Sequence, residues 1–593
     1  MAQKREEINA KDKWKLEDIF SSNEEWEKSF SELSKKYRDI TKYKGKIIDA
    51  DKVVECLTLE DSLSQILERL YVYASMRHDE DGAVEKYSAM KSRIEMLSVK
   101  MSEAESFITP ELTALDNEIL LAAASKEEGK PFSYYLKELI RSKDHILSSK
   151  EEEILAGTGS FAGDFRDIFG MFDNVDVKFG TVYDGDQKVT VTHGTYSKLL
   201  QSPNRLARAK AYRKMFNAYK DHIHTLSAVY AGNVKKNVFY AKVRKYNSVL
   251  ERALDGDDIP VSVYDSLIKS LDEHTPYMHE YVALRKKALN LDSMAMYDMY
   301  VPIVEGASLS VSYEEGCKIV KEALKPLGDE YAKLLDQSFN EGWIDVYENK
   351  GKRSGAYSWG TYGVHPYVLL NYNGTTHDVF TIAHELGHAM HSYYSNKSNP
   401  HASADYTIFV AEIASTVNEV LLIKHLLKTT KDKALRKYLL SYYLDMFRTT
   451  VFRQTMFSEF ERYAHMLIEK GDAITPQKLC KHYLKLNKKY YGKSVRHDNL
   501  ISYEWARIPH FYRAFYVYKY ATGMISAVSI ANMILEDKTG KALEGYKKFL
   551  SAGGSMAPLD ILNLAGVNLK EQSGFDYAMN EFKWALDMLK KEM

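Results

Sequence analysis

Residues 381–394 read TIAHELGHAMHSYY, with three histidines and one glutamate in an otherwise largely apolar run. His384 and His388 are four residues apart, a little over one helical turn, so both imidazoles project from one face of a helix. Two imidazoles at this spacing can bind one Zn²⁺, and Glu385 between them faces the open side of the metal. The stretch predicts a helix with two metal ligands and a general base; the alternative is a helix with two core histidines.

The flanking residues supply the helix that such a site needs. Thr376 or Asp378 can cap its start. Its apolar face consists of Val379, Phe380, Ile382, Ala383 and Leu386. Gly387 is a poor helix residue by ~1 kcal/mol relative to alanine, and its lack of a side chain would let a neighbouring element approach the metal helix closely.

A third ligand is predicted from a second apolar segment. His391 and Tyr394 stand where the extended metzincin motif needs glycine and histidine, so that ligand set is excluded. Residues 406–422 read YTIFVAEIASTVNEVLL, in which Glu412 is a carboxylate that is costly to bury unless it is paired or binds a metal. Together with the two histidines of the HExxH pattern, Glu412 would complete the His₂Glu set of a catalytic zinc.

Two residues near this set have open roles. Glu419 lies seven residues after Glu412 on the same helical face, and we interpret it either as a partner of a ligand imidazole or as half of a salt bridge. His391, three residues past His388, is interpreted as a pocket residue or as a residue that supports a ligand, rather than as a ligand itself.

The composition indicates a large globular protein without a basic excess. The chain has 593 residues, of which 45% are hydrophobic and 27% charged. Lysine plus arginine (81) nearly balances aspartate plus glutamate (82), which argues against a nucleic-acid partner. Three cysteines without CxxC spacing favour a reducing compartment. Because the chain shows neither a signal peptide nor ~18 consecutive apolar residues, we expect a cytoplasmic protein with no membrane segment.

The remaining sequence is mainly helical in pattern. Residues 24–125 have long amphipathic periodicity, which we interpret as a packed helical hairpin rather than a coiled coil. Residues 174–194 alternate apolar and polar side chains around Asp184-Gly185, which is typical of a β-hairpin. Residues 355–360 and 365–374 are short β-prone runs directly before the histidine stretch. We therefore predict a small β-sheet beside the metal helix.

Several stretches together resemble the oligoendopeptidase F family, zinc metallopeptidases related to thimet oligopeptidase. The most specific are HELGH followed by AEIASTVNE, and the PHFY and YVYKYATG runs near the C-terminal end. The supporting stretches are WKLEDIF (14–20), SGAYSWG (354–360), WARIPHFYRAFYVYKYATG (505–523) and GGSMAPLDILNLAGV (553–567). The resemblance spans nearly the whole chain.

The resemblance implies a mainly α-helical, two-lobed, clam-like zincin with a small β-sheet beside the HExxH helix and a deep internal channel. It also implies one Zn²⁺ per chain, held by His384, His388 and Glu412, and cleavage of short peptides rather than folded proteins. We divide the chain at residue 200 into an N-terminal helical domain (1–200), which contains the hairpin, and a zinc peptidase catalytic domain (201–593).

Further residues have expected catalytic roles. Glu385 would take a proton from a zinc-activated water and deliver it to the departing amine. The family places a histidine and tyrosines over the zinc, and His510 is the closest match to that histidine. Tyr512 and Tyr516 are expected to share a helical face and to stabilise the oxyanion, with aromatic core packing as the alternative.

Substrate is expected to bind along an exposed strand edge by adding a β-strand. The residues predicted for this contact are Gly355, Ala356 and Tyr357. Main-chain pairing accepts many sequences, so broad specificity is expected, whereas enclosure by helical lobes would exclude folded proteins.

Two alternative functions are carried forward. A zinc carboxypeptidase on a similar helical frame would need a cation for the terminal carboxylate, and Arg507 or Arg513 can supply it. A catalytically silent, helical peptide-binding protein is the other alternative. The presence of Glu385 beside all three ligands argues against it, since binding alone needs no general base.

Overall fold

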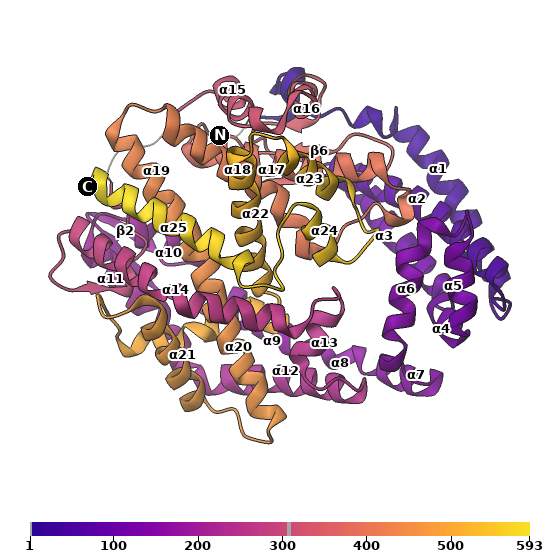
Figure 1. Ribbon diagram of the computed structural model, residues 1–593, viewed down its shortest axis with the longest axis horizontal. Helices are drawn as coiled ribbons and strands as arrows, with labels where there is room; N and C mark the ends of the chain where they lie inside the picture. Colours follow the sequence, from indigo (N-terminus) through magenta and orange to yellow (C-terminus); the bar gives the residue numbers. More distant parts are fainter. Residues whose placement is uncertain (1–2, 305–309) are drawn as a thin grey trace. The chain divides into compact units, whose positions relative to one another are not determined.

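The structure is a computed structural model that describes residues 3–304 and 310–593 (Figure 1). Its residues form two compact units, each assembled from three separate segments. The first unit comprises the described parts of 1–146, 308–428 and 527–567, and the second those of 147–307, 429–526 and 568–593. The predicted division of the chain into two domains lies at one position, residue 200. That domain boundary stays a prediction.

Helices dominate both units, as predicted. Helices of the first unit are α1 (Asn23–Lys36), α2 (Ala50–Glu80), α3 (Glu85–Glu105), α4 (Ile108–Ala114), α5 (Asn117–Ser125), α6 (Ser133–Ser142), α15 (Tyr313–Ala323), α16 (Asp329–Asn340), α17 (Thr376–Ser398), α18 (Ile408–Thr429), α23 (Lys541–Ser551) and α24 (Pro558–Leu564). Helices of the second unit are α7 (Ser149–Gly157), α8 (Gly159–Ala162), α9 (Asp164–Met171), α10 (His193–Gln201), α11 (Arg205–Asp221), α12 (Ile223–Val243), α13 (Val249–Asp255), α14 (Val261–Ala288), α19 (Lys433–Met446), α20 (Arg453–Glu469), α21 (Pro476–Tyr491) and α25 (Ser573–Glu592). Residues of α22 (Tyr518–Glu536) belong to both units.

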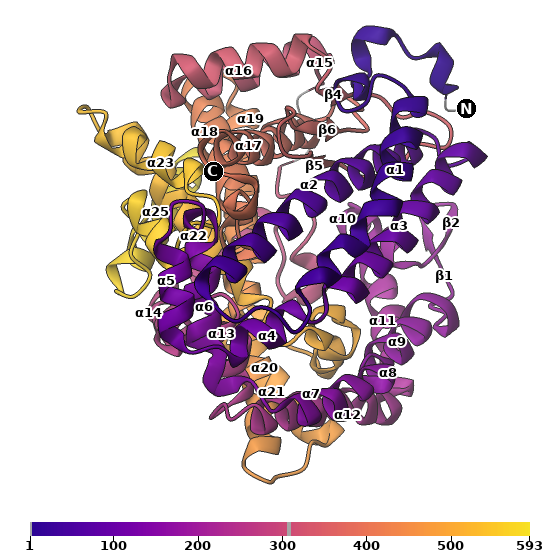
Figure 2. The same ribbon diagram turned by 90° about the vertical axis from the view of Figure 1, so that its right-hand side faces the viewer.

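The range 24–125, predicted as one helical hairpin, contains α1 to α5, and within it α2 and α3 form a hairpin and pack against each other (Figure 2). Asp49 caps α2 by accepting a hydrogen bond from the backbone of Lys52, as expected for an aspartate N-cap. The two helices bury apolar residues at helical spacing, including Val53, Leu57, Leu63, Leu70, Met90, Ile94, Leu97 and Met101. Burial of this shared face favours packing within the unit over a free coiled coil.

A three-stranded sheet beside α17 confirms the predicted small sheet. Its strand order is β4 (Ile344–Asp345), β6 (Tyr367–Leu369), β5 (Tyr357–Trp359). β4 is parallel to β6, whereas β5 is antiparallel to β6. β5 is therefore an edge strand, and α17 contacts both β5 and β6. The order of the strands leaves the outer edge of β5 unpaired within the described residues.

The second unit contains two small β-structures. β1 (Thr181–Asp184) and β2 (Gln187–Thr190) form the predicted hairpin, and Gly185 in its two-residue turn has a φ of 61°. This left-handed conformation favours glycine. β3 (Met294–Ala295) pairs in parallel with β7 (Val495–Arg496), a long-range pair that the sequence pattern did not indicate.

Candidate active site

A capping box fixes the start of the metal helix α17. The backbone N–H of Asp378 donates to Thr375 Oγ1 at 3.3 Å, and the N–H of Thr375 donates to Asp378 Oδ2 at 2.8 Å. Thr375 is the N-cap and Asp378 is its partner three residues later, whereas Thr376 is the first helical residue. Of the two predicted caps, Asp378 contributes to the box and Thr376 does not, because the helix begins at Thr376, one residue earlier than a Thr376 cap requires.

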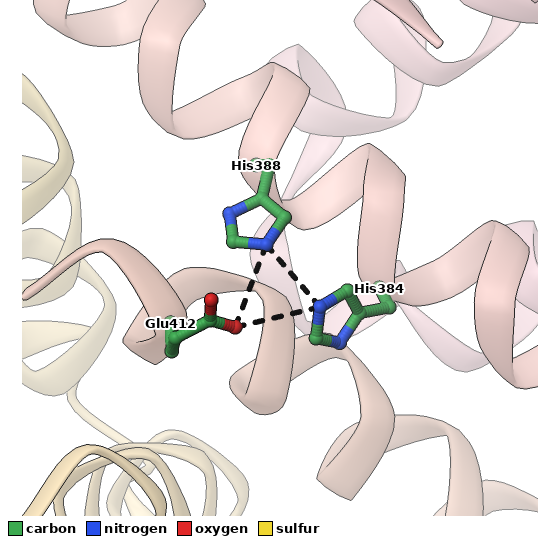
Figure 3. A group of neighbouring side chains, drawn as sticks. All are labelled: His384, His388 and Glu412. Atoms are coloured by element: carbon green, nitrogen blue, oxygen red, sulfur yellow. Dashed lines mark hydrogen bonds and ion pairs between the residues drawn. The ribbon is translucent and has the colours of Figure 1, made fainter. Parts of the chain in front are cut away.

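Three donor atoms converge between α17 and α18 (Figure 3). Nε2 of His384 and Nε2 of His388 are 3.2 Å apart. Oε2 of Glu412 lies 3.5 Å from the first nitrogen and 3.6 Å from the second. Figure 3 shows both rings turned toward the carboxylate, which comes from α18. The structure therefore brings the three predicted ligands together.

The separations between these atoms fit a bound zinc ion. Zinc binds histidine nitrogen and carboxylate oxygen at ~2.0–2.2 Å in tetrahedral geometry, which places two ligand atoms about 3.4 Å from each other. The three observed separations of 3.2, 3.5 and 3.6 Å lie close to that value. Two imidazoles and one carboxylate also match the donor set of a catalytic zinc site with a fourth position left for water.

Gly387 determines how closely α18 approaches α17. A Cβ built on Gly387 would lie 2.4 Å from Cα of Ser415 and 2.7 Å from the carbonyl oxygen of Ala414. The two backbones can therefore meet only because this residue has no side chain. Nearby, the buried Asn418 of α18 donates a 2.9 Å hydrogen bond to the carbonyl oxygen of Ala383 in α17. These contacts bring Glu412 within reach of the histidines, as predicted for Gly387.

A second carboxylate orients His384. Oε1 of Glu419 lies 2.9 Å from Nδ1 of His384, on the side of the ring opposite the ligand nitrogen. Of the two interpretations of Glu419, this hydrogen bond agrees with the one in which Glu419 is the partner of a ligand imidazole. Burial opposes the charged imidazole, but hydrogen bonds to Glu412 and Glu419 raise the pKa of His384 to about 10. Without a metal, the two carboxylates therefore hold a proton on this ring.

Glu385 is the buried carboxylate beside the ligand histidines. Only 7% of the residue is exposed. Burial raises the pKa of its carboxyl group, and Glu412 adds to this rise, whereas the two ligand histidines and a hydrogen bond from the backbone of Ser358 in β5 oppose it. A carboxylate with a raised pKa is suited to accept and release a proton near neutral pH.

A pocket of about 500 Å³ opens next to these residues. Its lining residues are Gly355, Ala356, Leu370, Asn371, Tyr372, His377, Asp378, Phe380, Thr381, His384, Glu385 and Glu419. The pocket therefore joins the residues that precede β5 to the metal helix. Asn371, His377 and Thr381 were not singled out from the sequence. His377 and Thr381 precede His384 by seven and three residues, and this helical spacing was the available signal.

The predicted substrate-binding residues divide into two groups. Gly355 and Ala356 line the pocket, and Gly355 has a φ of 87° with open space where a Cβ would lie. The side chain of Tyr357 has a different role, because its hydroxyl donates a 2.9 Å hydrogen bond to Asp79 and its ring contacts Trp14. For Tyr357, only the backbone stays available for the predicted pairing with substrate.

His510 and its neighbouring tyrosines belong to the second unit and do not form one helix. A short 3-10 helix covers Pro509–Tyr512, and Phe515 has a φ of 52°, so the predicted helical face shared by Tyr512 and Tyr516 is wrong. A left-handed residue between the two tyrosines ends the helical periodicity. Tyr512 stacks on Phe169 with ring centroids 4.6 Å apart. This contact agrees with aromatic core packing, the alternative to a role in stabilising the oxyanion.

Tyr516 and Tyr520 instead surround His510. The ring of His510 lies 6.3 Å from that of Tyr516 and 5.9 Å from that of Tyr520. The guanidinium of Arg513 lies over the Tyr516 ring at 3.9 Å. Burial and the charge of Arg513 lower the pKa of His510. Tyr520 was within the predicted aromatic segment but was not selected.

His391 is a packing residue and not a ligand. It is fully buried, and its ring stacks on Tyr406 at 3.6 Å and on Phe549 at 5.2 Å. Burial, with the neighbouring His388, lowers the pKa of His391 to about 3, so the ring is neutral. The residue stabilises the end of α17 beyond the metal ligands through these stacking contacts.

A helix-borne HExxH pair completed by a glutamate from a second helix defines a metal-dependent peptidase. A family model described as peptidase family M3 matches residues 198–581, and one described as oligopeptidase F matches residues 111–179. The chain belongs to peptidase family M3. It is a metalloendopeptidase of the oligopeptidase type, as predicted.

Similar proteins cover nearly the whole chain. Oligopeptidase PepF of Bacillus subtilis is 41% identical over 99% of this chain and 88% of its own length. Group B oligopeptidase PepB of Streptococcus agalactiae is 38% identical over 98% of this chain and 97% of its own. The crystal structure of oligoendopeptidase-F from Enterococcus faecium has a TM-score of 0.74 at 33% identity and covers 96% of this chain and 99% of its own. A crystal structure from Chlamydophila abortus reaches a TM-score of 0.95 at 34% identity and covers both chains fully.

Among the described residues, no helix combines the length and apolar character needed to cross a membrane.

Proposed function

We propose that this protein is a zinc-dependent oligoendopeptidase that cuts internal bonds of short, unstructured peptides. The observation that supports it best is the convergence of His384, His388 and Glu412 beside the pocket that Glu385 lines. These three ligands would hold one Zn²⁺ per chain. When bound, zinc lowers the pKa of a water molecule toward ~7 and polarises the scissile carbonyl.

Glu385 is the proposed general base and acid. Its raised pKa suits a group that first accepts the proton of the attacking water and then delivers it to the departing amine. Glu419 keeps the ring of His384 oriented through the 2.9 Å hydrogen bond to Nδ1. Because the Nδ1 side of that ring is already bonded, Nε2 remains the nitrogen available to a metal.

Substrate backbone is proposed to pair with the outer edge of β5. This edge has no partner strand within the described sheet, and β5 contacts the metal helix. The residues just before it, Gly355 and Ala356, line the pocket. Pairing through main-chain N–H and C=O groups explains how one site can accept many peptide sequences.

His510 and Tyr516 remain our proposed donors to the oxyanion. Their support is the family resemblance of the segment and the grouping of both rings with Tyr520 in the second unit. Tyr512 was proposed for the same role, and its stacking on Phe169 favours a packing role instead.

Metal analysis combined with peptide turnover tests the proposal. We expect about one zinc per chain, loss of activity after chelation, and recovery when zinc is restored. A peptide blocked at both ends, with a fluorophore and a quencher on opposite sides of its centre, should be cut internally. Full activity in a metal-free preparation, or cleavage only of peptides with a free C-terminus, would contradict the proposal.

Selection by substrate size and the location of the protein stay predictions. An enclosed channel would admit an unfolded peptide, whereas a folded domain would first have to unfold at a cost of ~5–15 kcal/mol. The same cleavable segment should therefore be cut in a peptide and spared in a rigid loop of a stable protein. A cytoplasmic location and the lack of nucleic-acid partners are predicted from the sequence, the second from its balance of charges.

A further inference from the structure

A second cavity, of about 300 Å³, lies in the first unit along the same helix and strand as the metal site. It is lined by Glu68, Ser358, Trp359, Gly360, Thr361, Tyr362, Val364, Pro366, Ser392, Asn396, His401, Ala404, Asp405 and Tyr406. We call it the distal pocket. Ser358 and Trp359 belong to β5, and Ser392 and Asn396 belong to α17. The distal pocket is thus bordered by the proposed substrate-binding strand and by the metal helix.

The spacing along α17 gives the distance of this pocket from the metal ligands. His388, Ser392 and Asn396 follow one another at four-residue intervals, so they occupy neighbouring positions along one side of the helix. A rise of ~1.5 Å per residue places Ser392 and Asn396 about 6 and 12 Å beyond His388. An extended peptide advances ~3.3 Å per residue. A peptide paired with β5 would therefore reach the distal pocket about two to four residues from the bond that is cut.

The charges around the distal pocket are mainly negative. Glu68 and Asp405 line it, and no lysine or arginine does. His401 also lines it, with Nδ1 2.6 Å from Asp61 and Nε2 2.8 Å from Glu68. Burial opposes the charged ring, but these two hydrogen bonds raise the pKa of His401 to about 9. Three carboxylates therefore surround one imidazolium, so the cluster has more negative than positive charge.

Asp405 is the carboxylate that this cluster leaves without a partner. Its side chain makes no hydrogen bond or ion pair within residues 3–304 and 310–593, whereas Asp61 and Glu68 both bind His401. Burial and the negative charge of Glu68 raise the pKa of Asp405. A role for the cluster in attaching His401 to α2 accounts for Asp61 and Glu68, but it gives Asp405 no function.

Two further features of the pocket suit a cationic ligand. Thr361 is 1% exposed, and its Oγ1 has no hydrogen-bond partner in the described part of the chain. Trp359 is 38% exposed, and the rings of Tyr362 and Tyr406 also line the pocket. Aromatic faces attract cations and cover the apolar stem of a lysine or arginine side chain. The unpartnered hydroxyl can accept a hydrogen bond from an ammonium group.

We infer that the distal pocket is a substrate subsite for a positively charged group, with Asp405 as its specificity-determining residue. The group is either the N-terminal ammonium or a basic side chain of the peptide, two to four residues from the scissile bond on one side. This inference rests on the proposed function, because it assumes that peptides extend along β5 past the metal ligands.

Paired quenched peptides test the inference. Each peptide has blocked ends and a neutral core, and a single lysine is moved through the positions on both sides of the cleaved bond. Its partner carries acetyl-lysine, which has the same stem without the charge. For the wild-type protein we expect kcat/KM to be about tenfold higher for lysine at two to four residues from the bond, on one side only, as a charge-assisted hydrogen bond supplies. A further arm replaces the N-terminal block by a free ammonium and so separates the two sources of charge.

In Asp405→Asn, the kcat/KM for the lysine peptide should be close to that for the acetyl-lysine peptide. The amide keeps the shape of the carboxylate but loses its charge. Asp39→Asn is the control, since it removes one carboxylate charge that does not line the distal pocket, and it should keep the wild-type ratio of the two values. A wild-type ratio near one at every position, or a ratio unchanged in Asp405→Asn, would overturn the inference.

Failure of the proposed function would look different. In that case neither peptide of a pair would be cut. Binding of the same fluorescent pair, measured by anisotropy, would then decide the subsite by itself. Preferential binding of the lysine peptide that is lost in Asp405→Asn supports it, and equal binding of both peptides refutes it.

Discussion

Replacing Gly387 by alanine tests whether the close contact between α17 and α18 sets the metal site. The added Cβ would lie 2.4 Å from Cα of Ser415 and 2.7 Å from its backbone nitrogen. Both are backbone atoms, so no side-chain rotation can relieve the clash. The helices must separate by about 1 Å to restore a normal carbon–carbon contact of ~3.5 Å. Because Glu412 is three residues before Ser415 on the same helix, that shift moves its carboxylate away from the histidines.

The expected effect on zinc binding is large compared with the effect on stability. Overpacking of this kind costs ~1–3 kcal/mol in the free energy of unfolding. Metal–ligand distances are held to about ±0.2 Å, so a shift of about 1 Å removes Glu412 from the coordination sphere. Loss of a residue that only orients a ligand weakens metal binding ~10–100-fold. We therefore expect Gly387→Ala to weaken zinc binding by at least about 100-fold, with a matching loss of peptidase activity at limiting zinc.

A chelator competition assay measures this change directly, with thermal unfolding of the metal-free protein run alongside. Gly157→Ala is the matched control, because a Cβ on this helical glycine of α7 meets nothing within 4 Å. It should leave zinc affinity unchanged. If Gly387→Ala keeps wild-type zinc affinity, α18 does not depend on this contact to present Glu412, and the reasoning fails.

Three other predictions concern charge. Glu385→Gln should keep zinc but lose nearly all turnover, whereas Glu412→Ala should lose zinc; metal analysis of both variants would expose reversed roles. Glu419→Gln should weaken zinc binding ~10–100-fold without changing the ligands, as measured by chelator competition. Because the pKa of His401 is raised to about 9 in the folded state, its contribution to stability is complete below its unfolded pKa of ~6.5 and is lost as the pH rises through 9. Between pH 6.5 and 9.5 the free energy of unfolding should fall by about 3 kcal/mol more in the wild type than in His401→Gln, and a pH dependence that is the same in both proteins would contradict this.

Features that depend on spacing within one helix were predictable from the sequence. The HExxH pattern places His384 and His388 on one face because α-helical hydrogen bonds fix the geometry of residues four apart. The same reasoning anticipated Gly387 as a point of close approach. It failed for Tyr512 and Tyr516, because the left-handed φ of Phe515 interrupts the helix that the reasoning assumed.

Distances between segments were decided only by the tertiary structure. Glu412 was identified as a costly buried carboxylate, but its 3.5 Å separation from His384 depends on how two helix backbones pack. The edge position of β5 depends on the order in which three strands pair. Asp405 and Glu68 come from distant parts of the sequence, and no local pattern shows that they line one pocket. Spacing along a chain encodes geometry only while regular hydrogen bonding continues, and beyond that the packing of side chains between elements determines which groups meet.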